Sequence, residues 1–452
     1  MSLPRRLDPA REVAYDALLA VRERDAYANL VLPALLADRH LATRDAAFAT
    51  ELVYGTLRGL GSYDEILRAN VTRPLDKLDP RVLDALRLGA HQLLAMRVGA
   101  HAAVDETVQL VRAKVGHAPT GLANAVLRKV GSASLQDWLE RLAPSRAVNP
   151  VAHFAITQSH PAWIVEAFRD ALGGDLDQVE AMLRADNEPP AVTLVARPGR
   201  SDVEELRALG ARSGRWAPTA AILDGGAPNA IAAVREGRAG VQDEGSQLVA
   251  LALAAVPVEG PDLRWLDLCA GPGGKAALLG ALARQRGAVL LAAELQPHRA
   301  RLVVRAAGDS AGVAVVDGRA PAWVHGSFDR VLVDVPCSGL GALRRRPESR
   351  WRRTAADVEQ LRPLQESLLR NAIRAARPGG VVAYATCSPH VGETRGVVSA
   401  VLDVLAGDVE QIDARPYLPG VDALGAGPHV QLWPHVHGTD AMYLAVLRRL
   451  PA

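Results

Sequence analysis

The sequence predicts an α/β protein, in which a doubly wound parallel sheet follows an all-helical region and a small mixed segment. Strand-like and helix-length runs alternate from about residue 246 to the end, which is typical of right-handed βαβ units. Apolar residues before position 142 recur at helical spacing with no competing strand pattern. The polar, proline-containing stretch 143–150 reads as a linker after that region.

The composition is that of an ordinary globular protein, since 49% of the 452 residues are hydrophobic, 23% are charged and the net charge is +2. No apolar stretch of signal-peptide type follows the N-terminus, and no charge-free run is long enough to span a bilayer. Only three cysteines occur, without the spacing of a zinc site or a disulfide framework. We therefore expect a cytoplasmic protein with neither a membrane nor a metal partner. We also expect a monomer.

Residues 1–142 are expected to form the helical domain. Two apolar stripes support this, one over Val104, Val108, Val111 and Val115 and the other over 83–93. Residues 151–245 are expected to form a small α/β linker segment, with helices over 161–172 and 175–185 and a strand over 191–196.

Residues 246–452 are expected to form the domain with the parallel sheet. Its helical run 248–255 is followed by short β-rich segments, which are 263–268, 288–293, 313–316, 331–335 and 381–386. A last run, 442–447, is expected to add an edge strand.

The three cysteines lie where predicted strands give way to loops. They stand in Asp267-Leu-Cys269-Ala-Gly-Pro-Gly-Gly-Lys275, Asp334-Val-Pro-Cys337-Ser-Gly339 and Ala385-Thr-Cys387-Ser-Pro389. Open parallel sheets build their sites at this edge, so the placement indicates thiolate chemistry beside a bound cofactor.

The glycines after the first predicted strand favour a cofactor loop, because they allow a close backbone approach at a helix N-terminus. Glu294, Asp317 and Asp334 end the next predicted strands, where they are placed to bind a nucleoside. Each acid alone could equally cap a helix or face solvent. A dinucleotide loop lacks its G-x-G-x-x-G spacing here and a P-loop is excluded, which leaves S-adenosylmethionine.

Two thiols and an acid at one edge suit methyl transfer to carbon 5 of cytosine. A thiolate that adds to carbon 6 makes carbon 5 nucleophilic, and an acid near ring nitrogen 3 offsets the developing charge. Asp334, Cys337 and Cys387 could converge over one base in this way, although inert buried cysteines are the alternative. Cys269 is expected to pack under the cofactor loop.

A cluster of arginines follows the Cys337 motif. It is either a solvated loop or, beside a candidate active site, a set of phosphate contacts, and we expect RNA contacts from Arg344, Arg345, Arg346, Arg350, Arg352 and Arg353.

Several segments resemble known families. Residues 47–58, 86–94 and 124–128 resemble the NusB-like RNA-binding domain. The motifs around Cys269, Cys337 and Cys387 resemble the RsmB/Sun branch of the Nol/Nop/Sun RNA cytosine-5 methyltransferases, and the resemblance runs over essentially the whole chain. It implies a Rossmann-like class I methyltransferase domain that makes 5-methylcytosine in small-subunit (16S) ribosomal RNA.

The resemblance also implies a role for each matched residue. Cys387 would be the nucleophile and Cys337 would assist product release. Gly271 and Val335 stand where the family commonly has alanine, and Ala441-Met442-Tyr443 replaces Gly-Phe-Phe. The implied cofactor contacts are Cys269, Ala270, Gly271, Pro272, Gly273, Gly274, Lys275, Glu294, Asp317 and Asp334.

Two rival functions stay open. A DNA cytosine-5 methyltransferase would use the Pro-Cys thiol as its nucleophile, and the second cysteine in Thr-Cys-Ser argues against it. A noncatalytic RNA-binding or antitermination factor could retain the fold, but it should have lost at least one of the intact site residues.

Overall fold

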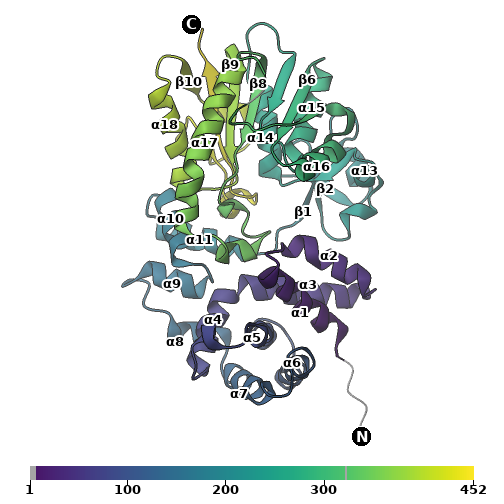
Figure 1. Ribbon diagram of the computed structural model, residues 1–452, viewed down its shortest axis with the longest axis vertical. Coiled ribbons are helices and arrows are strands. Elements are labelled where there is room, and N and C mark those ends of the chain that lie inside the picture. Colours follow the sequence, from purple (N-terminus) through teal and green to yellow (C-terminus); the bar gives the residue numbers. More distant parts are fainter. Residues whose placement is uncertain (1–6, 321–322, 452) are drawn as a thin grey trace. The chain divides into compact units, whose positions relative to one another are not determined.

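The computed structural model describes residues 7–320 and 323–451. Residues 1–6, which carry part of the localisation expectation, lie outside the described residues. The chain divides into two compact units (Figure 1). The helical unit comprises Met1–Pro189 and Leu343–Arg352, and the sheet unit comprises Pro190–Ala342 and Arg353–Ala452. The expected division into three domains stays a prediction.

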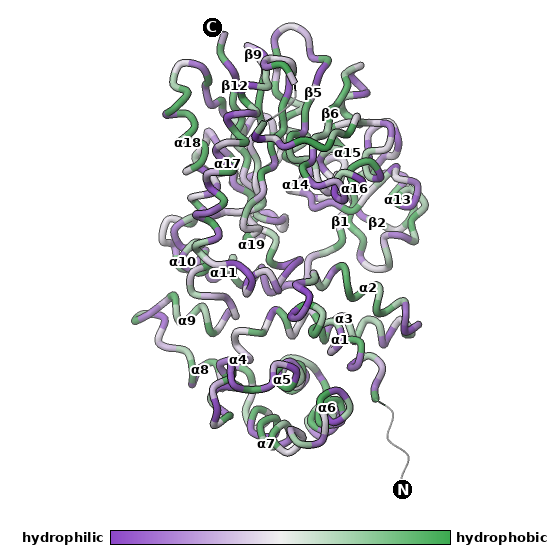
Figure 2. The backbone as a smooth tube through the Cα atoms, viewed as in Figure 1, coloured by the Kyte–Doolittle hydropathy of each residue, from purple (hydrophilic) through white to green (hydrophobic). Residues whose placement is uncertain are grey.

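The helical unit confirms the all-helical prediction for the first 142 residues, as far as they are described. Its helices alternate between hydrophobic and hydrophilic along their length (Figure 2), and their apolar sides share one core. The predicted stripes lie on α5 and α6. The helices are α1 Pro9–Glu23, α2 Ala28–Asp38, α3 Thr43–Arg58, α4 Leu60–Asn70, α5 Pro80–Leu94, α6 Ala100–Lys114, α7 Thr120–Val130, α8 Leu135–Leu142, α9 Pro150–Thr157, α10 Ala162–Ala171 and α11 Leu176–Asp186.

The sheet unit begins with a small antiparallel sheet in the order β2-β3-β1-β4. Its strands are β1 Val192–Ala196, β2 Ala211–Ser213, β3 Ala220–Leu223 and β4 Ala239–Val241, with the short helices α12 Val203–Ala208 and α13 Ala232–Arg235.

The main sheet has the order β10-β12-β9-β8-β5-β6-β7, and β11 pairs with β12. Strands β5 to β9 run parallel, as the alternating pattern predicts. The strands are β5 Arg264–Asp267, β6 Val289–Glu294, β7 Gly312–Val315, β8 Phe328–Asp334, β9 Ala376–Thr386, β10 Val409–Ile412, β11 Val430–Gln431 and β12 Tyr443–Arg449.

Helices cover both faces of the main sheet (Figure 1). One face packs against α14 Glu244–Ala255, α15 Gly274–Gln285 and α16 Pro297–Ala307. The other packs against α17 Ala355–Ala375 and α18 Arg395–Val404. Strand β9 shows why, since Val381, Ala383 and Ala385 face one core and Val382 and Tyr384 face the other.

The expected edge strand over 442–447 is wrong in its position. Strand β12 lies inside the sheet, antiparallel to β9 on one side and to β10 on the other. The sequence signal missed β10 because this strand is four residues long and two of them are polar.

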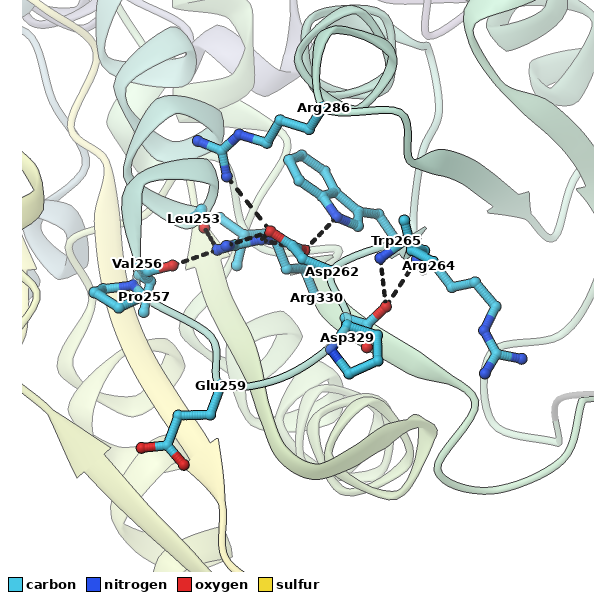
Figure 3. A network of polar contacts seen from close by, with 12 residues as sticks. Leu253, Val256, Pro257, Glu259, Asp262, Arg264, Trp265, Arg286, Asp329 and Arg330 are labelled. Atoms are coloured by element: carbon cyan, nitrogen blue, oxygen red, sulfur yellow. Dashed lines mark hydrogen bonds and ion pairs between the residues drawn. The ribbon is translucent and has the colours of Figure 1, made fainter.

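A buried polar network connects the elements at the end of the main sheet where β5 and β8 begin (Figure 3). Arg330, which is 3% exposed, donates to the carbonyl oxygens of Leu253 and Val256 at 2.6 Å and pairs with Asp262 at 2.7 Å. Asp262 also accepts from the Trp265 indole at 2.7 Å. The network therefore ties the end of α14 to the starts of β5 and β8.

Within the described part of the chain, no helix is long and apolar enough to cross a bilayer.

Candidate active site

The parallel strands β5 to β9 end at the same edge of the main sheet, so the residues that follow them converge there. Asp267 ends β5, Glu294 ends β6, Asp334 ends β8 and Thr386 ends β9. Asp317 follows β7 at a distance of two residues. The candidate acids and thiols therefore share one side of one unit.

The loop Cys269–Lys275 joins β5 to α15 through a backbone that requires glycine. Gly273 has a φ of +113°, and a Cβ there would lie 2.8 Å from the Ala306 side chain and 2.9 Å from the Val303 backbone. The helix starts directly afterwards, at Gly274. The loop thus presents backbone N–H groups and the positive end of a helix dipole.

Glu294 lies under this loop and is 5% exposed. Its carboxylate accepts from the Gly271 N–H at 3.0 Å and from the Gln296 N–H at 2.9 Å. A Cβ on residue 271 would lie 2.1 Å from one of the carboxylate oxygens. Glycine in place of the family's common alanine therefore gives the Glu294 carboxylate room to bond the loop.

Asp317 differs from Glu294 in being partly exposed and engaged by its neighbour. Its carboxylate accepts from the backbone N–H of Arg319 at 2.9 Å and pairs with the guanidinium at 2.7 Å. These hydrogen bonds lower the pKa of Asp317. The carboxylate stays ionised, but a ligand would have to share it with Arg319.

Lys275 and Asp334 form an ion pair with an Nζ–Oδ2 distance of 2.9 Å. Burial lowers the pKa of Lys275, but the charge of Asp334, together with the charges of Cys387 and Asp267, outweighs burial and raises it overall. Sequence reasoning gave Lys275 a place only in the cofactor loop. The structure links it to the predicted catalytic acid and to the electrostatics of Cys387.

Two further titratable groups, Asp267 and Cys269, lie where β5 gives way to the loop. Asp267 is 1% exposed, and burial together with the charge of Asp334 raises its pKa to about 7. Burial and the nearby carboxylates raise the pKa of Cys269 well above its usual value. Cys269 packs against one core of the sheet and remains a protonated thiol there.

The thiols of Cys337 and Cys387 meet, with 3.5 Å between their sulfur atoms. The hydrogen bond to Cys387, followed by burial and the charges of Cys387 and Glu393, raises the pKa of Cys337 well above its usual value. Cys337 therefore keeps its proton at neutral pH and is a poor nucleophile, while its S–H can donate to the sulfur of Cys387.

The arginine cluster is divided between the two units, since Leu343–Arg352 belongs to the helical unit and Arg353 belongs to the sheet unit. Arg350 is wholly buried and donates to the carbonyl oxygens of Arg58, Ser159 and Asp186 at 2.7–3.2 Å. The expected phosphate contact of Arg350 is corrected by this burial, since its guanidinium serves the protein's own carbonyl groups. Arg352 likewise donates to Val21 and Ala26 carbonyl oxygens at 2.8 and 2.6 Å.

The other arginines of the cluster differ in exposure. Arg344 is buried, whereas Arg346 and Arg353 are exposed and Arg345 is half-buried. Arg346 lies over the Tyr27 ring, 4.8 Å from its centroid. Phosphate contact by this exposed part of the cluster stays a prediction.

Sequence reasoning missed Glu393, which is 0% exposed and contacts both cysteine loops. Its carboxylate accepts from Ser338 and Ser388, the residues that follow the two cysteines. An acid six residues after Cys387 resembles an ordinary helix-start residue, so the sequence holds no signal that marks it. Among the described residues, no cluster of three or more His, Cys, Asp or Glu side chains is placed to hold a metal ion.

Comparison with known proteins adds to this geometry. A profile of the family described as 16S rRNA methyltransferase RsmB/F matches residues 252–448, and one of the NusB family matches residues 8–132. A Mycobacterium tuberculosis protein named as a candidate methyltransferase is 54% identical, over 99% of this chain and 98% of that protein. The ribosomal RNA small subunit methyltransferase B of Vibrio cholerae is 32% identical, over 97% of each chain. The crystal structure of the protein PH0851 is 21% identical and shares the fold, with a TM-score of 0.79 over 99% of this chain and 100% of that one.

Proposed function

Because this chain belongs to the RsmB/F family of ribosomal RNA methyltransferases, with a NusB domain in front, we propose that it methylates carbon 5 of a cytosine in small-subunit (16S) ribosomal RNA. Membership makes it an S-adenosylmethionine-dependent RNA methyltransferase. Our proposal goes beyond family membership by naming the target: the base, the carbon atom that is methylated and the ribosomal subunit. The relative named as a small-subunit methyltransferase, at 32% identity, supports the choice of subunit.

The residues at the sheet edge fit the cofactor. One buried side-chain oxygen each of Asp267 and Gln242 has no hydrogen-bond partner within the protein and is left for a ligand. The residues that would hold S-adenosylmethionine are the loop Cys269–Lys275, Glu294, Asp317 and Asp334. When bound, the cofactor supplies an electrophilic methyl group.

The observation that carries the proposal is the pair of thiols 3.5 Å apart beside the Lys275–Asp334 ion pair. In the proposed mechanism Cys387 adds to carbon 6 of cytosine and makes carbon 5 nucleophilic. As negative charge develops at ring nitrogen 3, that nitrogen accepts the proton that the Lys275 ammonium group shares with the Asp334 carboxylate. Once carbon 5 carries the methyl group that bound S-adenosylmethionine would supply, a base takes the carbon 5 proton, the C5–C6 double bond forms again and the Cys387 thiolate leaves. Cys337 assists that release.

Bisulfite sequencing of ribosomal RNA tests the proposal in cells with and without the gene, and in deletion cells that carry either the wild-type gene or Cys387→Ala. We expect one protected cytosine of 16S RNA to disappear on deletion and to return only with the wild-type gene. Loss of a protected cytosine from another RNA instead would show that the target lies in that RNA. Unchanged protection in every RNA would favour the noncatalytic RNA-binding factor.

The remaining expectations follow from the same proposal. The enzyme would act in the cytoplasm, where ribosomal RNA is made, and as a monomer. Duplex DNA should not be methylated by the purified protein, which distinguishes the proposal from the DNA cytosine-5 methyltransferase.

A further inference from the structure

Glu393 is a buried carboxylate that no step of the proposed mechanism uses. It ends the short turn Val391–Glu393 of the sheet unit and has 0% of its surface exposed. Burying a carboxylate away from water costs free energy unless hydrogen-bond donors surround it. The donors around Glu393 therefore identify the groups that its side chain holds in place.

Those donors come from both cysteine loops. Oε1 accepts from the Ser338 N–H at 2.7 Å, and Oε2 accepts from the Ser338 hydroxyl at 2.5 Å and the Ser388 hydroxyl at 2.6 Å. Ser338 directly follows Cys337 and Ser388 directly follows Cys387. One side chain therefore holds the residue next to each thiol.

Two more contacts extend the arrangement to the surrounding elements. Gln365 of α17 donates to Oε1 of Glu393 at 3.1 Å and to the carbonyl oxygen of Pro336 at 2.9 Å. The Tyr384 hydroxyl of β9 donates to the backbone carbonyl of Glu393 at 2.6 Å. Glu393 is thus fixed through its backbone to β9, which ends directly before Cys387, and through its carboxylate to α17, which follows the Cys337 loop.

We propose that Glu393 is a positioning residue that sets the separation of the Cys337 and Cys387 thiols through Ser338 and Ser388. The inference rests on the proposed function, in which both thiols act on one base. Glu393 touches neither sulfur in this arrangement, so it acts through the two serines. An error of about 1 Å between reacting groups can cost roughly 100-fold in rate, which makes such a clamp consequential.

Glu393→Gln tests the clamp because it keeps the shape of the side chain while replacing one acceptor by an NH₂ group that faces donors. Glu393→Asp keeps the charge and serves as the conservative variant. Glu359→Gln, an exposed glutamate of α17, is the matched control. Ser388→Ala removes one hydroxyl donor and serves if Glu393→Gln fails to fold.

The first measurement is methyl transfer with RNA and S-adenosylmethionine. We expect Glu393→Gln to lower kcat by roughly 10- to 100-fold. KM for RNA and Kd for the cofactor should stay within about twofold of wild type, since only the thiol geometry changes. Glu393→Asp should recover part of the loss and Glu359→Gln none of it. A loss of kcat that merely follows a loss of folded protein or of cofactor affinity would overturn the proposal.

The second measurement needs no RNA and separates this inference from the proposed function. Diamide oxidises two neighbouring thiols to a disulfide and is itself reduced by the two hydrogens, and peptide mass spectrometry measures how fast Cys337 and Cys387 join. We expect the rate in Glu393→Gln to differ at least fivefold from wild type and Glu359→Gln. An equal rate in all three proteins would show that Glu393 does not set the separation, even if the wild type methylates no RNA.

Discussion

Cys337 and Cys387 have sulfur atoms 3.5 Å apart, yet their surroundings assign them different tasks. The raised pKa of Cys337 keeps that thiol protonated beside Cys387. Cys387, in contrast, interacts electrostatically with the ammonium group of Lys275. We therefore expect Cys387→Ala to abolish methyl transfer without a covalent adduct, and Cys337→Ala to attack but release slowly.

Denaturing electrophoresis of each variant with RNA and cofactor checks this division. A protein–RNA species that survives denaturation should accumulate with Cys337→Ala and be absent with Cys387→Ala. The reverse pattern would make Cys337 the nucleophile, as in the DNA enzymes.

Asp267 gives the protein a stability that depends on pH. Its pKa is about 7 in the fold, because of burial and the charge of Asp334, against an ordinary value of 3.8. Between these values the unfolded chain has lost a proton that the folded protein keeps, so rising pH favours unfolding. The full effect, on the order of 4 kcal/mol, is reached above pH 7.

Asp267→Asn removes this ionisation and keeps the side chain's shape. We expect thermal unfolding without cofactor to show a higher Tm than wild type at pH 8 and a similar Tm at pH 4.5. An equal difference at both pH values would contradict the buried, protonated carboxyl.

The limit of sequence reasoning at this scale is shown by Glu393. Cys387 and Asp334 could be found because each belongs to a short motif at a strand end. Glu393 could not, because its role depends on Ser338, which is 55 positions away along the chain. Its partners are assembled only when β8 and β9 pair.

At the scale of elements, we expect the Arg330 network to stabilise the end of the main sheet where β5 and β8 begin (Figure 3). Asp262→Ala leaves a guanidinium that is 3% exposed without its carboxylate. We expect a cost of about 3 kcal/mol, the lower end for a broken buried ion pair, because two carbonyl acceptors remain. Chemical denaturation measures it.

Asp224→Ala is the matched control for that measurement. Asp224 pairs with Arg212 at 3.0 Å in the same unit, but both side chains are more than half exposed. Such a pair contributes about 0–1 kcal/mol. Similar losses in the free energy of unfolding from both substitutions would show that the Arg330 network stabilises the protein no more than an exposed ion pair does.

The elements themselves were predictable where their pattern is local. The parallel strands β5 to β9 follow from short apolar runs between helices, and α5 and α6 follow from their stripes. The sequence predicted strand β12 but placed it at the edge of the sheet, because the strand's own residues do not identify its pairing partners, β9 and β10. That choice depends on packing across the sheet rather than on the strand's own residues.

At the scale of the whole molecule, Arg346 and Arg353 are the exposed arginines of the cluster, and they are the ones that we expect to contact RNA. If each contacts a phosphate, replacing both by glutamine should weaken RNA binding and reduce the slope of log affinity against log salt by about 0.7 for each contact on single-stranded RNA. Filter binding over a range of salt concentrations measures the slope, and cofactor affinity should not change. An unaltered slope would leave the two arginines as solvated side chains.

The Leu343–Arg352 segment has a consequence for how such a protein can evolve. The helical unit looks like a detachable N-terminal module, yet its fold includes a stretch encoded between the Cys337 motif and α17. Glu348 accepts from the Ala28 N–H at 3.0 Å, and Arg350 binds carbonyl groups from three separate parts of the helical unit. Recombination at the boundary near residue 189 would therefore exchange only part of that unit. During evolution, an intact helical unit can be exchanged only if the gene segment that encodes Leu343–Arg352 is exchanged as well.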